Sequence, residues 1–348
     1  MAKLTQFSPV YIFQPVLSSL LLLMLVRNNN KVSVAGLILS MLVAAYFLLN
    51  TVLFSNNYST YINFFCGIFS FYTIVSLYRY FSIATILNVI INSAKYIVVI
   101  LVVDSLYRIL NPAMPTSEAL EAVQGTEYAF YMYKFSTVMF ADSNTVAIVC
   151  VSLFFLLDYC SKRFFVNTTI LRLIILVILL SCLSRSAIFS VIISMFLLNK
   201  KLSLRGKLVF LMGGLFPAAF YILSSFFNDG SFVSKLFILQ AFFHYLSDAD
   251  LSSLLLGVGL GNSPLYLNNI YSHIHIVTSI VEGGLIGSLL IIVFLLYYLN
   301  LSKYHGLYVV LPNIILGFSY FFYLGAPFVF VPMALIVMLE LRLSKIEC

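Results

Sequence analysis

The sequence predicts an all-α polytopic membrane protein, and three observations support this fold class. Of the 348 residues, 62% are hydrophobic and only 9% are charged. The mean hydropathy of +1.06 is atypical of soluble domains. Apolar runs of about 17 to 25 residues recur along the chain, the length that a helix needs to cross roughly 30 Å of hydrocarbon.

We expect about 11 transmembrane helices in a single transmembrane domain, 1–348. The predicted spans cover residues 10–26, 32–54, 61–78, 82–103, 143–160, 168–184, 186–198, 207–226, 274–298, 307–323 and 325–341. Two long polar connections separate them, a first loop at 104–142 and a second loop at 227–273. The five cysteines show no CxxC and no paired spacing in a loop, so neither a zinc site nor a disulfide framework is indicated.

The distribution of charge predicts the orientation in the membrane. With both long loops outside, 13 of the 19 Lys and Arg residues fall on the inner side, as the positive-inside rule requires. Eight of the 12 acidic residues then lie outside or at the outer face. The net charge of +7 is therefore explained by orientation, and no nucleic-acid partner is expected.

The segment SCLSRSAIF places Arg185 between two short apolar halves, so the chain is expected to turn near this arginine. One interpretation is an arginine that snorkels to the membrane interface. The other is a cation that lines a polar cavity, since Arg185 lies on the outer side, against the trend of the other basic residues. A guanidinium group suits phosphate because it donates two hydrogen bonds in fixed geometry.

The second loop contains a stretch, Leu236 to Leu246, with helical apolar spacing that is too short to span a membrane. We expect a short amphipathic helix there on the outer surface, with Lys235 at its start. The GVGLGN segment that follows resembles a dinucleotide fingerprint only superficially, because neither a preceding strand nor a suitably spaced acidic residue supports it. Its glycines are expected to let the backbone pack closely or approach a ligand.

The segment SHIHIVTSIVEGGLIG begins the next predicted span. His275 and Glu282 are seven residues apart and share a helix face, whereas His273 lies at the helix entrance. Glu282 could form a structural pair with a basic residue or take part in chemistry, and the GxxxG of Gly283 and Gly287 favours helix packing. A histidine here is suited to proton transfer because its pKa is near neutral.

The segment KFSTVMFADSN, from Lys134 to Asn144, leads into the fifth predicted span. Asp142 or Ser143 is expected to cap the helix that follows.

In this order, the four segments resemble the family of O-antigen polymerases and O-antigen ligases, the Wzy-type lipid-linked glycan transferases. The family has an asparagine near the start of a span after an F-x-D/N-x-N-like stretch, and an SRS-like arginine at the outer end of a span. It also has a basic residue and a short helix in a large external loop, followed by an lGvGlgn segment. The last motif is a histidine separated by eight residues from Glu-x-Gly. The matching positions here are Phe140, Asp142, Asn144, Arg185, Lys235, Leu256 to Asn262, His273, Glu282 and Gly284. By this register His273 corresponds to the family histidine, whereas the face shared with Glu282 favours His275.

The resemblance implies a membrane glycosyltransferase C-type fold in the bacterial inner (plasma) membrane, with a metal-independent active site that faces the periplasm or outer leaflet. It implies no cofactor. The expected partners are an undecaprenyl-diphosphate-linked oligosaccharide, membrane lipids and a chain-length regulator protein. The predicted catalytic residues are His273, Arg185 and Glu282, and the predicted substrate-binding residues are Lys235, Asn144, Arg108, Lys134, His275 and Asn262.

Three functions stay open from the sequence. A polymerase would transfer glycan from one lipid diphosphate to the sugar of another lipid-linked repeat unit of O-antigen, capsule or exopolysaccharide. A ligase would use the same donor and attach the glycan to lipid A core. A lipid-linked sugar flippase or transporter would be expected to show inverted repeats and broken helices in corresponding halves, and no such symmetry is apparent.

Overall fold

The computed structural model describes residues 34–55, 57–112, 137–138, 140, 142–199, 202–203, 205–207, 230–270, 272–319 and 326–345, together with 16 and 19. Within them the secondary structure is helical throughout, in agreement with the predicted fold class. Among the described residues, six helices are long and apolar enough to cross a membrane. They are Val34–Ser55 (α2, Val34–Asn50, with the π-helical turn η1), Tyr58–Arg79 (α3, Tyr58–Ser76, with the 3-10 turn η2, Leu77–Arg79), α4 (Ile83–Leu110), α7 (Ser143–Phe164), α15 (His275–Leu301) and α17 (Pro327–Ser344).

Three shorter apolar helices of the described residues, each of 10–17 residues, correspond to predicted spans: α8 (Thr169–Ser181), α9 (Arg185–Leu197), which begins one residue before its predicted span, and α16 (Leu307–Gly317). The chain turns between α8 and α9 at residues 182–184, immediately before Arg185, as its sequence predicts. The predicted spans 10–26 and 207–226 fall almost entirely outside the described residues, so the total of 11 stays a prediction.

Side-chain contacts show which helix ends lie at the same end of the bundle. At one end Asn50, which ends α2, donates to the Leu256 carbonyl of the second loop, and Gly317 at the end of α16 lies against His275 at the start of α15. At the other end, Arg163 of α7 binds Glu340 of α17. We name these the outer and inner ends, after the orientation that the basic residues predict.

Helix α7 forms the centre of the bundle. In its most apolar 18-residue stretch 83% of the residues are buried, against 28% for α4. The helix packs against α8, α16 and α17, and its Ser152 accepts a hydrogen bond of 3.0 Å from Asn313 Nδ2 of α16. The main core therefore surrounds α7, whereas much of α4 faces outward.

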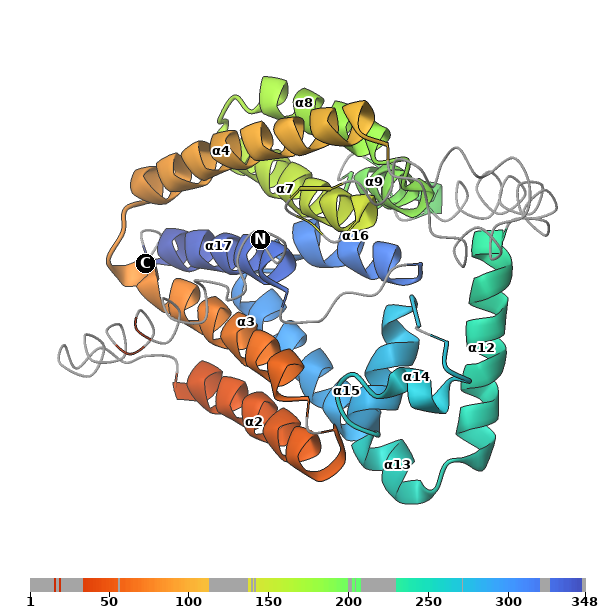
Figure 1. Ribbon diagram of the computed structural model, residues 1–348. Helices are drawn as coiled ribbons and strands as arrows, with labels where there is room; N and C mark the ends of the chain where they lie inside the picture. The colour runs from red at the N-terminus through yellow and green to blue at the C-terminus, as the bar shows by residue number, and fades with distance from the viewer. Residues whose placement is uncertain are drawn as a thin grey trace.

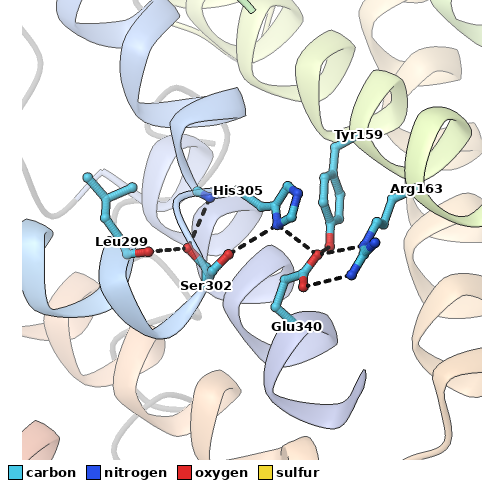
Figure 2. A network of polar contacts seen from close by, with 7 residues as sticks. Tyr159, Arg163, Leu299, Ser302, His305 and Glu340 are labelled. Atoms are coloured by element: carbon cyan, nitrogen blue, oxygen red, sulfur yellow. Dashed lines mark hydrogen bonds and ion pairs between the residues drawn. The ribbon is translucent and has the colours of Figure 1, made fainter. Parts of the chain in front are cut away.

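Charged side chains join α7 to its neighbours at the inner end. Figure 2 shows Glu340 of α17 accepting hydrogen bonds from Tyr159 Oη at 2.7 Å and Arg163 Nε at 3.1 Å. The Nδ1 atom of His305, in the turn between α15 and α16, lies 3.1 Å from the same carboxylate oxygen. Because Glu340 is almost fully buried, this network fixes α7, α17 and the α15–α16 turn to one another.

Two loop boundaries differ from the sequence interpretation. Helix α4 continues to Leu110, seven residues beyond the predicted end of its span at 103, so Asp104 and Arg108 belong to a helix and not to the first loop. In the second loop, α12 (Gly230–Asp248) is a helix of 19 residues and exceeds the short helix expected over Leu236 to Leu246. The predicted span ends before Asp104 because this is the first acidic residue after the apolar run, whereas α4 continues and buries both Asp104 and Arg108.

The second loop lies at the outer end of the bundle. It contains α12 and two short helices, α13 (Leu251–Leu256) and α14 (Ser263–Tyr266). Figure 1 shows α12 running across the direction of α4, α7 and α17, beside the bundle end where α15 begins. This direction agrees with a helix that lies along the membrane surface instead of crossing it.

Candidate functional site

The outer half of α15 is bent at a glycine. Gly284 has a φ of +65° inside the helix, so the first two turns point in a different direction from the rest, as Figure 1 shows. The bend leaves backbone groups of Val281 and Glu282 outside the helical hydrogen-bond pattern. Val258 N donates to the Val281 carbonyl at 2.9 Å, and Gly259 N donates to the Glu282 carbonyl at 3.1 Å.

Two glycines allow this pairing of loop and helix. A Cβ atom on Gly257 (φ +77°) would lie 2.3 Å from the Glu282 carbonyl oxygen, and one on Gly284 would lie 2.3 Å from the Leu255 carbonyl oxygen. Both neighbours are backbone atoms that cannot move aside, and both φ values favour glycine. The GVGLGN segment thus packs backbone against backbone, which is one of the two roles expected for its glycines.

Helix α2 supports the same junction from the opposite side. Tyr46 Oη donates to the carbonyls of Leu256 and Gly283, at 3.0 and 2.7 Å. Asn50 Nδ2 donates to the Leu256 carbonyl at 2.7 Å. The Cβ positions of Gly283 and Gly287 face Phe47 and Tyr46, so the GxxxG packs α15 on α2, as the sequence indicates.

Glu282 lies inside this junction and is 3% exposed. Its Oε1 atom accepts a hydrogen bond of 2.7 Å from Ser263 Oγ, the first residue of α14, and the backbone amides of Gly261 and Ser263 also face the carboxylate. A pair with a basic residue is one expectation from the sequence, whereas the Ser263 hydroxyl and these backbone amides are neutral donors. Glu282 therefore fixes the start of α14 to α15.

Asn262, a predicted substrate-binding residue, uses its side-chain amide for hydrogen bonds within the same junction. Its Nδ2 atom donates to the Phe54 carbonyl at 2.9 Å and to the Val258 carbonyl at 3.0 Å. These bonds connect the end of the GVGLGN segment to the turn η1 (Thr51–Ser55) that continues α2. The geometry gives Asn262 a structural position.

Asp142 caps α7, as one of the two sequence alternatives predicts. Its Oδ1 accepts hydrogen bonds from the backbone N and the Oγ1 of Thr145, at 2.9 and 2.8 Å, and its Oδ2 accepts one of 3.1 Å from Asn144 Nδ2. Asp104 of α4 holds the segment that precedes the cap, because its Oδ1 accepts a hydrogen bond of 2.8 Å from Val138 N. These contacts thus join the start of α7 to the outer end of α4.

Apolar packing brings α12 to the entrance of α15. Ile238 of α12 is fully buried in a cluster that also contains Ile274 and Val277. Lys235 lies about one turn before Ile238 on α12, and His273 immediately precedes Ile274. The cluster therefore places Lys235 beside His273, although 38 residues separate them in the chain.

Two residues of other predicted motifs, Lys235 and Asp142, act on the charge state of His273. Its side chain reaches solvent, but surrounding protein atoms partly desolvate the ring, and this lowers the pKa of His273 from its usual value of 6.5. The charge of Lys235 lowers the pKa further, and the charge of Asp142 opposes both effects. A lowered pKa keeps the imidazole neutral near pH 7, the form that accepts a proton.

Arg185 and His275 lie at the same end of the bundle. Arg185 is the exposed first residue of α9, and α9 packs on α16 through a hydrogen bond from Ser190 Oγ to the Pro312 carbonyl. The outer end of α16 carries Gly317, whose Cβ position lies 3.0 Å from the Cβ of His275. His275 thus packs on α16, while His273, two residues earlier, lies beside α12.

Arg108 does not lie on a surface that substrate can reach. It is fully buried in α4, where its Nη2 donates to Ser181 Oγ at 3.1 Å and approaches Cys182 Sγ at 3.8 Å. It therefore holds α4 against the turn that precedes Arg185, a position that does not fit the predicted contact with substrate. Lys134 lies outside the described residues.

Sequence reasoning missed Tyr46, Asn50 and Asp104, the polar residues that support the site from α2 and α4. Each lies in or near the end of an apolar run, where a polar side chain also suits a membrane interface. Asp104 and Arg108 are four residues apart, and this spacing could have indicated a polar helix face that continues beyond the span. Among the described residues, no three His, Cys, Asp or Glu side chains gather as metal ligands would.

No protein-family model matches the chain, and no curated protein matches it closely enough to indicate a relative. The resemblance to the Wzy-type transferases therefore depends on the ordered motifs alone.

Proposed function

We propose that the protein is a polymerase of lipid-linked polysaccharide repeat units. In this proposal it transfers glycan from undecaprenyl diphosphate to the sugar of a second lipid-linked unit, at the outer leaflet of a bacterial inner membrane. The observation that carries the proposal is the position of His273 beside Lys235 and Asp142, because three separate motifs of the resemblance converge on one histidine.

The proposed reaction forms one bond and breaks another. A hydroxyl oxygen of the acceptor sugar attacks the anomeric carbon of the donor, and the bond from that carbon to the diphosphate oxygen breaks. His273 accepts the hydroxyl proton, and the electron pair leaves with the lipid diphosphate. General-base assistance of this kind typically contributes about 10² to 10⁴ in rate.

Arg185 and Lys235 supply positive charge for the leaving diphosphate in this mechanism. Arg185 is exposed at a helix start and can offer a planar pair of donors to phosphate oxygens. Lys235 serves twice, because its charge also adds to the desolvation that lowers the pKa of His273. Glu282 then acts by holding the GVGLGN segment and α14, and it is a positioning residue in this proposal.

Deletion of the gene and analysis of surface glycan length test the proposal in the native organism. Loss of a polymerase leaves glycans of a single repeat, whereas loss of a flippase abolishes export. Purified protein with lipid-linked repeat units then distinguishes polymer formation from transfer to lipid A core. Polymer formation that stops in excess EDTA would contradict the metal-independent mechanism.

Arg185→Ala and Arg185→Lys test the diphosphate contact. The alanine variant is expected to make no polymer at a normal protein level in the membrane. The lysine variant is expected to recover only part of the rate, because an ammonium group lacks the bidentate geometry. Wild-type chain length from Arg185→Ala would remove this residue from the site.

A further inference from the structure

A long apolar groove lies away from the outer site, between α4 and α17. The cavity has a volume of about 560 Å³, and its lining is apolar except for Thr85 and Ser93. Helix α7 contributes Val149, Leu153 and Leu156, and α3 with the turn η2 contributes Ile74 and Leu77.

The groove follows the helices lengthwise. Its lining on α4 runs from Thr85 to Ile97, twelve residues apart, which corresponds to about 18 Å at 1.5 Å per residue. Val89 and Phe81 line the groove and are also exposed, so the groove opens toward the outside of the bundle. In a membrane this opening faces lipid, and a narrow apolar groove along the bilayer normal suits a single hydrocarbon chain.

Basic residues mark the inner mouth of the groove. On α17, the lining residues Val331, Leu335 and Met338 form a stripe at helical spacing, and Arg342 and Lys345 continue this stripe beyond the apolar part. Neither Arg342 nor Lys345 forms an ion pair with any described residue, and the buried Nε of Arg342 has no hydrogen-bond partner among them. The opposite face of α17 carries Glu340, which is bound to α7.

A third cation, Arg79 of the turn η2, lies beside this stripe. Lys345 Nζ lies 5.1 Å from the ring centre of Tyr78, and Arg79 Cζ lies 5.4 Å from the same ring. Tyr78 and Arg79 directly follow Leu77, which lines the groove. Three basic residues therefore surround the point where the apolar lining ends.

We propose that this groove binds an anionic phospholipid of the leaflet at the inner end, with one acyl chain along α4 and α17 and the phosphate at Arg342, Lys345 and Arg79. The inner end carries most of the basic residues, so this leaflet is the cytoplasmic one in the predicted orientation. The site is separate from His273 and does not depend on the proposed transferase activity. It would fill the space that loose packing leaves between α4 and α17.

Lipid retention after purification tests the headgroup contact. The full-length protein is incorporated into nanodiscs of equal parts phosphatidylglycerol and phosphatidylcholine, extracted with mild detergent, and analysed by native mass spectrometry for retained lipid. We expect selective retention of phosphatidylglycerol. Arg342→Gln with Lys345→Gln should lower this selectivity by roughly fivefold for each cation removed. The charge-conserving pair Arg342→Lys with Lys345→Arg should retain it, which separates lost charge from lost folding.

Arg205→Gln is the matched control for charge, because Arg205 is an exposed basic residue away from the groove. Ser93→Phe is designed to fill the groove, and Val99→Phe adds the same ring to an exposed position of α4 outside it. Ser93→Phe should reduce retention of both lipids, and Val99→Phe should not. Equal retention by these two variants would overturn the chain site, and selectivity that is equal in wild type and the double glutamine variant would overturn the headgroup site.

Discussion

The two ends of the bundle hold their buried charges in different ways. At the inner end carboxylates form ion pairs, Asp158 with Arg172 Nη1 at 2.7 Å and Glu340 with Arg163 Nε at 3.1 Å. At the outer end the equally buried Glu282 is bound by Ser263 and backbone amides, all of them neutral donors. Buried Arg108 is likewise held by neutral groups of the α8–α9 turn.

This difference indicates that the charges at the inner end hold the helices together. Pairing a buried acid with a base fixes helices to one another and neutralises both charges. Glu282, in contrast, fixes a loop without using any of the cations that the proposed reaction needs for its diphosphate. The charges around His273 act instead on its pKa, and a shifted pKa is typical of groups that take part in catalysis. The predictions below test whether the outer end serves chemistry and the inner end stability.

The largest effect is expected from His273→Ala at the outer end. The purified variant should lose about 10² to 10⁴ in polymerisation rate while it keeps its melting temperature, because the side chain reaches solvent. His275→Ala is the matched control, since His275 packs on Gly317 of α16 and is expected to affect the rate less. A wild-type rate for His273→Ala, measured with lipid-linked repeat units, would remove the proposed base.

Gly284→Ala is expected to remove folded protein and not only activity. Alanine at a φ of +65° costs about 1 to 3 kcal/mol, and overlap with the Leu255 carbonyl oxygen adds to this cost. Gly206→Ala at the inner end is the control, because its Cβ would make an ordinary contact of 3.4 Å with Ser203 Oγ. Membrane levels and melting temperatures of the two variants measure the difference, and normal levels of Gly284→Ala would contradict the close approach.

At the inner end, Arg163→Gln should lower stability without changing chemistry. It leaves the buried Glu340 without its arginine, which is expected to cost on the order of 3 kcal/mol. Lys162→Gln should cost less than about 1 kcal/mol, because the Lys162 side chain is half exposed. Thermal unfolding in detergent measures both, with activity per folded molecule as the second readout. A reduced rate at full stability for Arg163→Gln would show that the inner end also serves the reaction.

Much of the fold could be predicted from the sequence, because apolar runs determine membrane spans almost directly. The turn before Arg185 and the cap at Asp142 followed from local composition. The GVGLGN junction could not be predicted in detail. Gly257 and Gly284 are far apart in the sequence, and only the folded structure brings their backbones into contact. Periodicity placed Glu282 and His275 on one face, yet the bend at Gly284 and the α12 contact distinguish the surroundings of His273 from those of His275.

The smallest effect is a pair of opposite shifts in the pH dependence of kcat/KM. A general base is active when unprotonated, so the rate falls as the pH drops through the pKa of His273. Lys235 lowers this pKa, so Lys235→Gln should move the acid limb to higher pH. Asp142 raises it, so Asp142→Asn should move the limb to lower pH, and asparagine still caps α7. The position of the limb is independent of any loss of diphosphate binding, which changes only the height of the profile. Lys162→Gln at the inner end should leave the limb in place. Shifts of the same sign in the two outer variants would separate His273 from its neighbours and return the outer end to a structural role.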